Sequence, residues 1–186
     1  MIARPHPTLP DLAIVEPAIH RDTRGAFYEA WNGTRYAEAG IRGPFVQDNV
    51  VRSTHAVLRG LHFQHPTAQG KLVSVIRGAI FDVAVDIRRG SPTFGRCATL
   101  QLDDASCRQL WVPRGLGHGY CVLSEEADVL YKVDAPYRPD EEGVIAWDDP
   151  ALAIPWPVDE PVINGRDRAG VRLQDIAGLP RYETKA

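Results

Sequence analysis

Residues 71–87, KLVSVIRGAIFDVAVDI, give the clearest indication of the fold class of this chain. Its two β-rich runs, 71–76 and 79–87, are separated by the turn-like pair Arg77-Gly78, a pattern typical of two strands joined by a tight connection. In the second run, period-two alternation places Asp82, Ala84 and Asp86 on one face. Two acids in an otherwise apolar strand indicate either a solvated outer face or the polar interior of a barrel, where carboxylates orient functional side chains.

Outward from this stretch, further strand-like runs lie near 97–102, 107–112, 118–123 and 128–133. Fifteen prolines and 16 glycines punctuate the chain, and the only plausible early helix is about two turns around 34–39. Short strands without helix-length segments between them predict an all-β sandwich or jelly-roll barrel with a few short helices. The 186 residues predict a single domain, 1–186, whose proline-rich and acidic part from about residue 138 wraps the barrel.

Composition is that of a soluble globular protein, with 44% hydrophobic and 24% charged residues. The net charge of −3 provides no general attraction to nucleic acid or to an anionic membrane. The first ten residues lack the pattern of a secretory signal and no apolar run could span a bilayer, so we expect a cytoplasmic protein with neither nucleic acid nor membrane as partner. Cys97, Cys107 and Cys121 form no CxxC pair, which favours reduced thiols and no zinc site.

The segment PRGLGHGY, residues 113–120, resembles the second motif of the cupin superfamily of small jelly-roll barrels with a central cavity. Metal-binding cupins usually also supply two histidines one residue apart and a following glutamate. Here the earlier segment is GLHFQHP, residues 60–66, in which His62 and His65 point to opposite sides of an extended strand. Gln64 is a poor metal ligand, so we expect no metal and no other cofactor.

Lys71 begins a strand on the same face as Val73 and Val75. An ammonium that faces a barrel interior requires a partner such as Asp82 or Asp86, or an anionic ligand or enolate oxygen. The alternative is a solvent-exposed strand end.

Several motifs then occur together and in order: DTRGAFYE (22–29), QDN (47–49), VLRGLHFQ (57–64), QGKLV (69–73), DVAVDIR (82–88), SPTFG (91–95), YK (131–132), Tyr137 and WP (156–157). With them the chain resembles the dTDP-4-dehydrorhamnose 3,5-epimerase family from about residue 10 to 175. The resemblance implies a metal-free cupin-type barrel and a homodimer. It also implies epimerisation of dTDP-4-dehydro-6-deoxy-D-glucose toward dTDP-4-dehydro-L-rhamnose.

The resemblance also implies catalytic roles for four residues. Removing a proton beside the C4 ketone gives an enolate, and returning one to the opposite face inverts the carbon, so the reaction needs a base and an acid on opposite sides of the sugar. By resemblance the base is His62, the acid is Tyr131, and Lys71 holds the C4 oxygen. Asp167 matches the aspartate that pairs with the base, although Asn164 and Arg166 replace the usual Ser and Lys of its loop.

Twelve side chains fall at positions that the family pattern places around the substrate, and some of them could come from the partner subunit. They are Arg24, Phe27, Glu29, Gln47, Asp48, Asn49, Arg59, Lys71, His118, Tyr137, Glu142 and Arg166. Arginines suit a diphosphate because they donate two parallel hydrogen bonds, and Tyr137 is expected to stack on thymine.

Strict alternation puts Arg59 and His62 on opposite faces, whereas the resemblance needs both near the ligand, so we expect a β-bulge at Gly60. Leu116 and Gly117 stand where the family more often has Phe and Ala, which we expect to change the cavity wall and which keeps open a 3-only or 5-only epimerase. A metal-dependent cupin enzyme and a non-catalytic sugar-binding barrel are the more distant alternatives. The missing ligand pair disfavours the first, and the combination of His62, Lys71 and Tyr131 disfavours the second.

Overall fold

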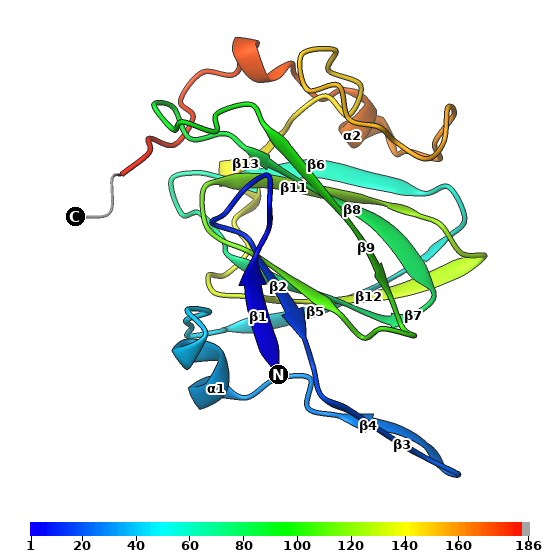
Figure 1. Ribbon diagram of the computed structural model, residues 1–186. Coiled ribbons are helices and arrows are strands. Elements are labelled where there is room, and N and C mark those ends of the chain that lie inside the picture. The colour runs from blue at the N-terminus through cyan, green and yellow to red at the C-terminus, as the bar shows by residue number, and fades with distance from the viewer. Residues whose placement is uncertain (184–186) are drawn as a thin grey trace.

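Two facing antiparallel sheets form the walls of a barrel in the computed structural model, which describes residues 1–183 (Figure 1). One sheet contains β1 (Ile2–Pro5), β2 (Ala13–Glu16), β5 (Gln47–Thr54), β7 (Lys71–Arg77), β10 (Gln109–Val112) and β12 (Glu126–Val133), in the order β1-β2-β10-β7-β12-β5. The other contains β6 (Leu58–Gln64), β8 (Ala79–Asp86), β9 (Cys97–Asp103), β11 (Leu116–Val122) and β13 (Glu142–Val144), in the order β13-β6-β11-β8-β9. The predicted all-β class is confirmed.

The remaining elements are short. Strands β3 (Ile19–Asp22) and β4 (Gly25–Tyr28) form a hairpin that projects from the barrel (Figure 1). The helices are α1 (Gly33–Glu38), α2 (Gly165–Arg168) and the 3-10 turns η1 (Pro139–Glu141) and η2 (Leu173–Asp175). Within the described part of the chain, no helix has the length and apolar character needed to cross a membrane.

The two strands expected within residues 71–87 form as β7 and β8, each within one residue of its expected end, but they lie in different sheets. Gly78 makes the turn between them with φ +82°, and a Cβ at this position would lie 2.1 Å from the Glu126 carbonyl oxygen. Only glycine tolerates both the backbone angle and this close approach. The turn therefore carries the chain across the barrel from one wall to the other instead of closing a hairpin.

Apolar side chains on β8 divide the core into two layers. Ala84 faces the barrel interior, where it packs with Val73 and Val75. Val83 and Val85 face outward, beneath a second buried cluster that the chain after β13 supplies through Ile145, Leu152, Leu173 and Leu179. Figure 1 shows this C-terminal stretch lying over the outer face of the five-stranded sheet.

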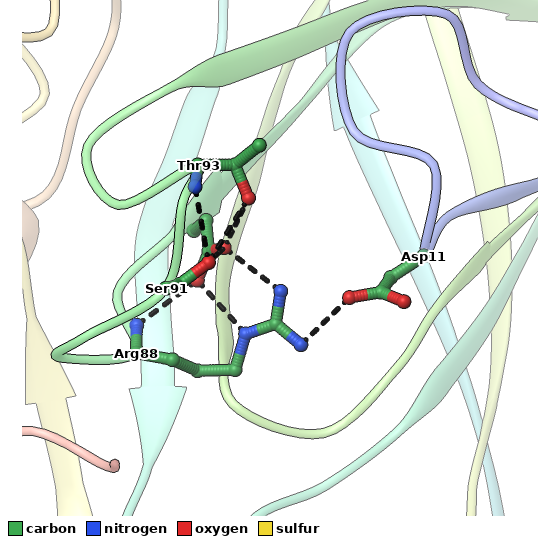
Figure 2. A network of polar contacts seen from close by, with 5 residues as sticks. Asp11, Arg88, Ser91 and Thr93 are labelled. Atoms are coloured by element: carbon green, nitrogen blue, oxygen red, sulfur yellow. Dashed lines mark hydrogen bonds and ion pairs between the residues drawn. The ribbon is translucent and has the colours of Figure 1, made fainter. Parts of the chain in front are cut away.

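The two acids of β8 are fully buried, which excludes the solvated outer face. Asp82 is bound by His118 inside the barrel, as the second interpretation of the alternation requires. Asp86 instead accepts hydrogen bonds from Arg88, Ser91 and Thr93 at the end of the strand. Figure 2 shows that the same arginine reaches Asp11, with 2.9 Å between the nitrogen and the oxygen. This network ties the loop after β8 to the N-terminal segment.

Asp86→Asn is expected to lower the free energy of unfolding by about 3 kcal/mol, because it leaves a mostly buried arginine without its main counter-ion. Burial opposes the charge of Asp86, but the bonds from Arg88, Ser91 and Thr93 outweigh it and lower the pKa to about 2 from 3.8. The stabilisation is therefore complete above pH 4 and is lost as pH falls toward 2.

Denaturant unfolding of both proteins at several pH values measures this effect. Glu16→Gln is the matched control, since it removes a carboxylate from the surface ion pair with Arg4 and should cost less than about 1 kcal/mol. Equal losses for the two variants would contradict the structural role assigned to Asp86.

Candidate active site

A cavity of about 310 Å³ opens between the two sheets. Strands β5, β7 and β12 supply one wall, and β6 and β11 supply the facing wall. The lining residues are Gln47, Asn49, Val51, Arg59, His62, Gln69, Lys71, His118, Gly119, Tyr120, Tyr131, Tyr137, Glu142 and Arg166. The cavity therefore holds three of the four residues expected to be catalytic, together with most of the expected substrate-binding residues.

His62 and Tyr131 come from opposite walls, since β6 and β12 belong to different sheets. Nε2 of His62 lies 2.8 Å from Oδ1 of Asp167, so Nδ1 is the ring nitrogen left available. Burial raises the pKa of Tyr131, and the nearby Arg59 offsets this only in part. The site thus presents an imidazole on one wall and, on the facing wall, a phenol that retains its proton.

The bulge expected at Gly60 is present and brings Arg59 and His62 into the same cavity. His62 pairs with His118 and Arg59 pairs with Tyr120, so two residues of β6 oppose the single residue Gly119 of β11. The φ of Gly60 is +107°, and a Cβ there would lie 2.6 Å from the His118 carbonyl oxygen. The extra residue resets the alternation, which is what a bulge does to a strand.

Asp167 contacts His62, although the two residues are 105 positions apart in the sequence. Further hydrogen bonds fix its position. Its side chain is 1% exposed and accepts the Gly60 N–H at 2.9 Å, and Asn164 caps α2 by accepting the Asp167 N–H at 2.7 Å. Burial alone would raise the Asp167 pKa, but the hydrogen bonds from His62 and Gly60 lower it. The altered loop therefore still presents a carboxylate to the imidazole.

Lys71 faces the cavity at the start of β7 and brings a cation without a close counter-ion. Desolvation lowers its pKa to about 8, and Glu142, Asp82 and Asp134 offset the loss only in part. Within residues 1–183, no carboxylate lies within ion-pair distance of its ammonium. Such a group is suited to an anionic ligand or to an oxygen that becomes negative during reaction.

The other polar residues of the cavity fall into two groups. His118 is 7% exposed and its Nε2 lies 2.9 Å from an oxygen of Asp82, which fixes the ring on the β11 wall. Tyr137, half exposed at the mouth, donates a hydrogen bond of 2.5 Å to Glu142, and Arg166 forms an ion pair with the same carboxylate. Glu142 Oε1 also lies 3.9 Å from Nδ1 of His62.

Four expected substrate-binding residues lie outside the cavity of their own chain. Arg24 and Phe27 belong to the projecting β3–β4 hairpin, and Phe27 is 71% exposed. Glu29 pairs with Arg35 beside α1. Asp48 points away because alternation along β5 turns Gln47 and Asn49 inward, and it pairs with a lysine of β12 on the outer face.

Sequence reasoning missed two polar lining residues, Gln69 and Tyr120. Tyr120 could have been found because it lies two residues after His118 and therefore on the same face of β11. The expectation that Leu116 and Gly117 change the cavity wall is wrong. A Cβ at Gly117 would lie 2.7 Å from Cδ1 of Ile145, under the C-terminal segment, and neither Leu116 nor Gly117 lines the cavity.

The family model described as dTDP-4-dehydrorhamnose 3,5-epimerase matches residues 6–175, a range that includes every strand lining the cavity. The chain belongs to the dTDP-4-dehydrorhamnose 3,5-epimerase family. A family member from Pseudomonas aeruginosa is 47% identical over 174 residues, which cover 92% of this chain and 96% of the relative. The barrel is thus that of a nucleotide-sugar epimerase, which is an isomerase.

Two solved epimerase structures have the same fold. A dTDP-6-deoxy-D-glucose-3,5-epimerase from Legionella pneumophila, in complex with dTDP-4-keto-L-rhamnose, matches with a TM-score of 0.95 at 46% identity, covering 98% of this chain and 99% of its own. A 3'-monoepimerase from Streptomyces bikiniensis, in complex with dTDP-quinovose, matches with a TM-score of 0.87 at 35% identity, covering 92% and 87%. The predicted cupin-type barrel is confirmed.

Among residues 1–183, no three His, Cys, Asp or Glu side chains cluster so as to hold a metal ion.

Proposed function

We propose that this epimerase converts dTDP-4-dehydro-6-deoxy-D-glucose to dTDP-4-dehydro-L-rhamnose by proton transfer at C3 and C5. The observation that carries the proposal is that His62 and Tyr131 line one cavity from opposite walls, with Lys71 in the same cavity. Inversion of a carbon requires a base and an acid on opposite faces of the sugar ring, and the two walls supply one of each.

In the proposed mechanism, Nδ1 of His62 removes the proton from the carbon beside the C4 ketone. The electron pair of the broken C–H bond moves to the C4 oxygen, and the ammonium of Lys71 stabilises the resulting enolate. The electron pair then returns from the C4 oxygen to the same carbon, which takes the proton of Tyr131 on its opposite face, and this completes the inversion. Solvent takes the proton from His62 and returns one to Tyr131 before the second carbon reacts. Asp167 orients the imidazole and stabilises it once it is charged. The reaction is an isomerisation that consumes no oxidant or reductant, and we propose no cofactor.

For the nucleotide, we propose that thymine stacks on Tyr137 at the mouth and that the diphosphate is bound by cations such as Arg59 and Arg166. Both arginines line the cavity, and Arg59 makes its hydrogen bond to a neutral group, Ser53 Oγ, at 3.0 Å. Guanidinium groups suit phosphate oxygens because they donate paired hydrogen bonds.

We further propose that the enzyme is a cytoplasmic homodimer in which Arg24, Phe27 and Glu29 serve the partner's cavity. The hairpin that bears two of these residues projects from its own barrel (Figure 1), and the outer face of the six-stranded sheet exposes Val50 and Ile76. The hairpin, whose Phe27 is 71% exposed, suits contact with a second copy of the chain. Light scattering should give about twice the chain mass of 20.6 kDa, whereas a monomer would contradict this part of the proposal.

Deuterium uptake from D2O tests the function directly. With dTDP-4-dehydro-6-deoxyglucose as substrate, we expect deuterium at both C3 and C5 and a product with the L-rhamno configuration, observed by NMR and mass spectrometry. Exchange at C3 alone would favour the second candidate, a 3-only epimerase like the Streptomyces relative at 35% identity. Absence of exchange at both carbons would contradict the proposed function.

The pH dependence of kcat/KM should report the protonation state of Lys71. Desolvation lowers the pKa of this lysine to about 8, so its charge in the free enzyme is lost as pH rises through that value. We expect kcat/KM to fall above pH 8, because a neutral amine stabilises an enolate poorly. Lys71→Arg should be slower overall but should keep its rate to higher pH, since guanidinium stays protonated. An unchanged alkaline limb in Lys71→Arg would assign that limb to another group.

A further inference from the structure

Asp82 is a buried acid on β8 that takes no part in the proposed mechanism. It is 0% exposed, and among residues 1–183 the only hydrogen-bond partner of its side chain is Nε2 of His118, which lies 3.0 and 2.9 Å from its two oxygens. No lysine or arginine in this part of the chain forms an ion pair with it. A carboxylate that leaves water without a cationic partner is costly, so this one requires a compensating charge nearby.

Asp86, further along the same strand, shows how this fold neutralises a buried carboxylate directly. It is also 0% exposed, and Arg88, Ser91 and Thr93 donate hydrogen bonds to it. Arg88 places a full positive charge 2.8 Å from one of its oxygens. Asp82 has a histidine in place of that arginine, so its counter-charge must come from elsewhere in the barrel.

Lys71 is the complementary case on the facing wall of the barrel. Desolvation lowers its pKa to about 8, and no carboxylate among residues 1–183 lies within ion-pair distance of its ammonium. Three acids nevertheless favour its charge through space, namely Glu142, Asp82 and Asp134. The cation and the carboxylate of Asp82 therefore compensate one another across the barrel interior, although they do not touch.

The other two acids near Lys71 are paired with arginines. Glu142 forms an ion pair with Arg166, and Asp134 forms one with Arg114. Of the three acids, only Asp82 has no arginine partner within the described part of the chain. The remaining ionisable side chains of the cavity carry no negative charge at neutral pH; they are Arg59, His62, His118, Tyr120, Tyr131, Tyr137 and Arg166.

We propose that Asp82 is a positioning residue of the active site, whose carboxylate fixes the ring of His118 and supplies a counter-charge for Lys71 without contacting the substrate. The inference rests on the proposed function, in which Lys71 stabilises an enolate. His118 stands in register opposite His62, so its ring lies beside the proposed base. Because the Asp82 oxygens are bound by His118, the ammonium of Lys71 keeps its N–H donors for a ligand oxygen.

Titration of the lysine side-chain signals by NMR tests the inference on the ligand-free protein. The chain has three lysines, and Lys71→Arg identifies the signal of Lys71. In wild-type protein we expect this signal to titrate near pH 8. In Asp82→Asn it should titrate at lower pH, because the amide still offers an acceptor to His118 but no longer provides a negative charge that favours the ammonium.

Asp86→Asn is the matched control, since it makes the same chemical change at another 0% exposed position of β8. It should destabilise the protein and leave the titration of Lys71 unchanged, because the charge of Asp86 is neutralised by Arg88 and does not contribute to the pKa of Lys71. An equal displacement of the titration in both variants would assign the effect to loosening of the barrel and would overturn the inference.

Turnover measurements then connect the charge of Asp82 to the reaction. At pH 8, Asp82→Asn should lower kcat/KM about 10-fold, as for the loss of one interaction with a charged group, and its alkaline limb should move to lower pH. In a Lys71→Arg background the same substitution should move no limb, because guanidinium stays protonated. A limb that moves equally in both backgrounds would exclude Lys71 as the group through which Asp82 acts.

A double variant covers the case in which Asp82→Asn alone does not fold. Lys71→Met combined with Asp82→Asn buries neither charge, so it should melt at a higher temperature than Asp82→Asn, or fold where that variant does not. A double variant that is no more stable than Asp82→Asn would mean that the two charges do not compensate one another.

Two further results would overturn the inference. One is an unchanged titration of Lys71 in Asp82→Asn, and the other is a His118 ring whose Nε2 carries no proton in the nitrogen NMR spectrum of the wild-type protein. These measurements need no substrate. Wild-type protein that shows the coupling of Asp82 to Lys71 but exchanges no deuterium would refute the proposed function alone, so the two failures are distinguishable.

Discussion

His62→Asn is expected to abolish deuterium exchange at both C3 and C5 of dTDP-4-dehydro-6-deoxyglucose, with a loss of about 1,000-fold or more in rate. The variant removes the imidazole nitrogen that faces the cavity and retains a side chain of similar polarity. In the proposed mechanism one base, His62, which lies 2.8 Å from Asp167, serves both sides of the C4 ketone, so both centres should fail together. NMR detection of protons lost from C3 and C5 in D2O measures the two rates separately.

His65→Asn provides the control for this substitution. His65 follows closely in the sequence but does not line the cavity, so its variant should exchange at the wild-type rate. Binding of dTDP by His62→Asn should persist, which would show that the site is still assembled. Wild-type exchange by His62→Asn would remove His62 from the role of base, and loss at only one carbon would require a second base.

Tyr131→Phe is expected to separate proton removal from inversion. His62 and Lys71 remain in place, so deuterium should still enter from the His62 side, and the substrate should become labelled with retained configuration. Product with inverted configuration should fall by about 100-fold or more, because no group on the β12 wall then returns a proton to the opposite face. Product configuration and label content, followed together over time, give both rates.

The control for this prediction is Tyr36→Phe, which deletes the oxygen of a buried phenol that does not line the cavity and should alter neither rate. Parallel loss of exchange and inversion in Tyr131→Phe would mean that the phenol is needed to stabilise the enolate as well. Full inversion by the variant would exclude Tyr131 as the acid and direct attention to another proton donor of the cavity.

Local patterns in the sequence predicted much of this architecture. Period-two alternation in residues 71–87 gave the two strands, and the glycine inside VLRGLHFQ predicted the bulge that the structure has at Gly60. These features can be predicted from the sequence because the alternation of side chains along a strand and the backbone freedom of glycine both depend on only a few neighbouring residues. The resemblance then named His62, Lys71 and Tyr131, which the fold brings into one cavity.

The positions of Phe27, Asp48 and Gly117 could not be predicted in this way. Phe27 lies on a projecting hairpin, and Asp48 points to the outer face of β5. A Cβ at Gly117 would meet Ile145 and would not face the cavity. Each outcome depends on which face of a strand meets which layer of the barrel. A motif of a few residues carries no information about that layer.

Local residue patterns thus specified an all-β fold, and the motifs named the residue types able to move protons in it. The entry of β7 and β8 into opposite sheets across a single turn, and the contact of Asp167 with His62, became visible only in the folded chain. Backbone preferences act between neighbours in the chain. Contacts across a cavity instead depend on how strands distant in the sequence pack against one another.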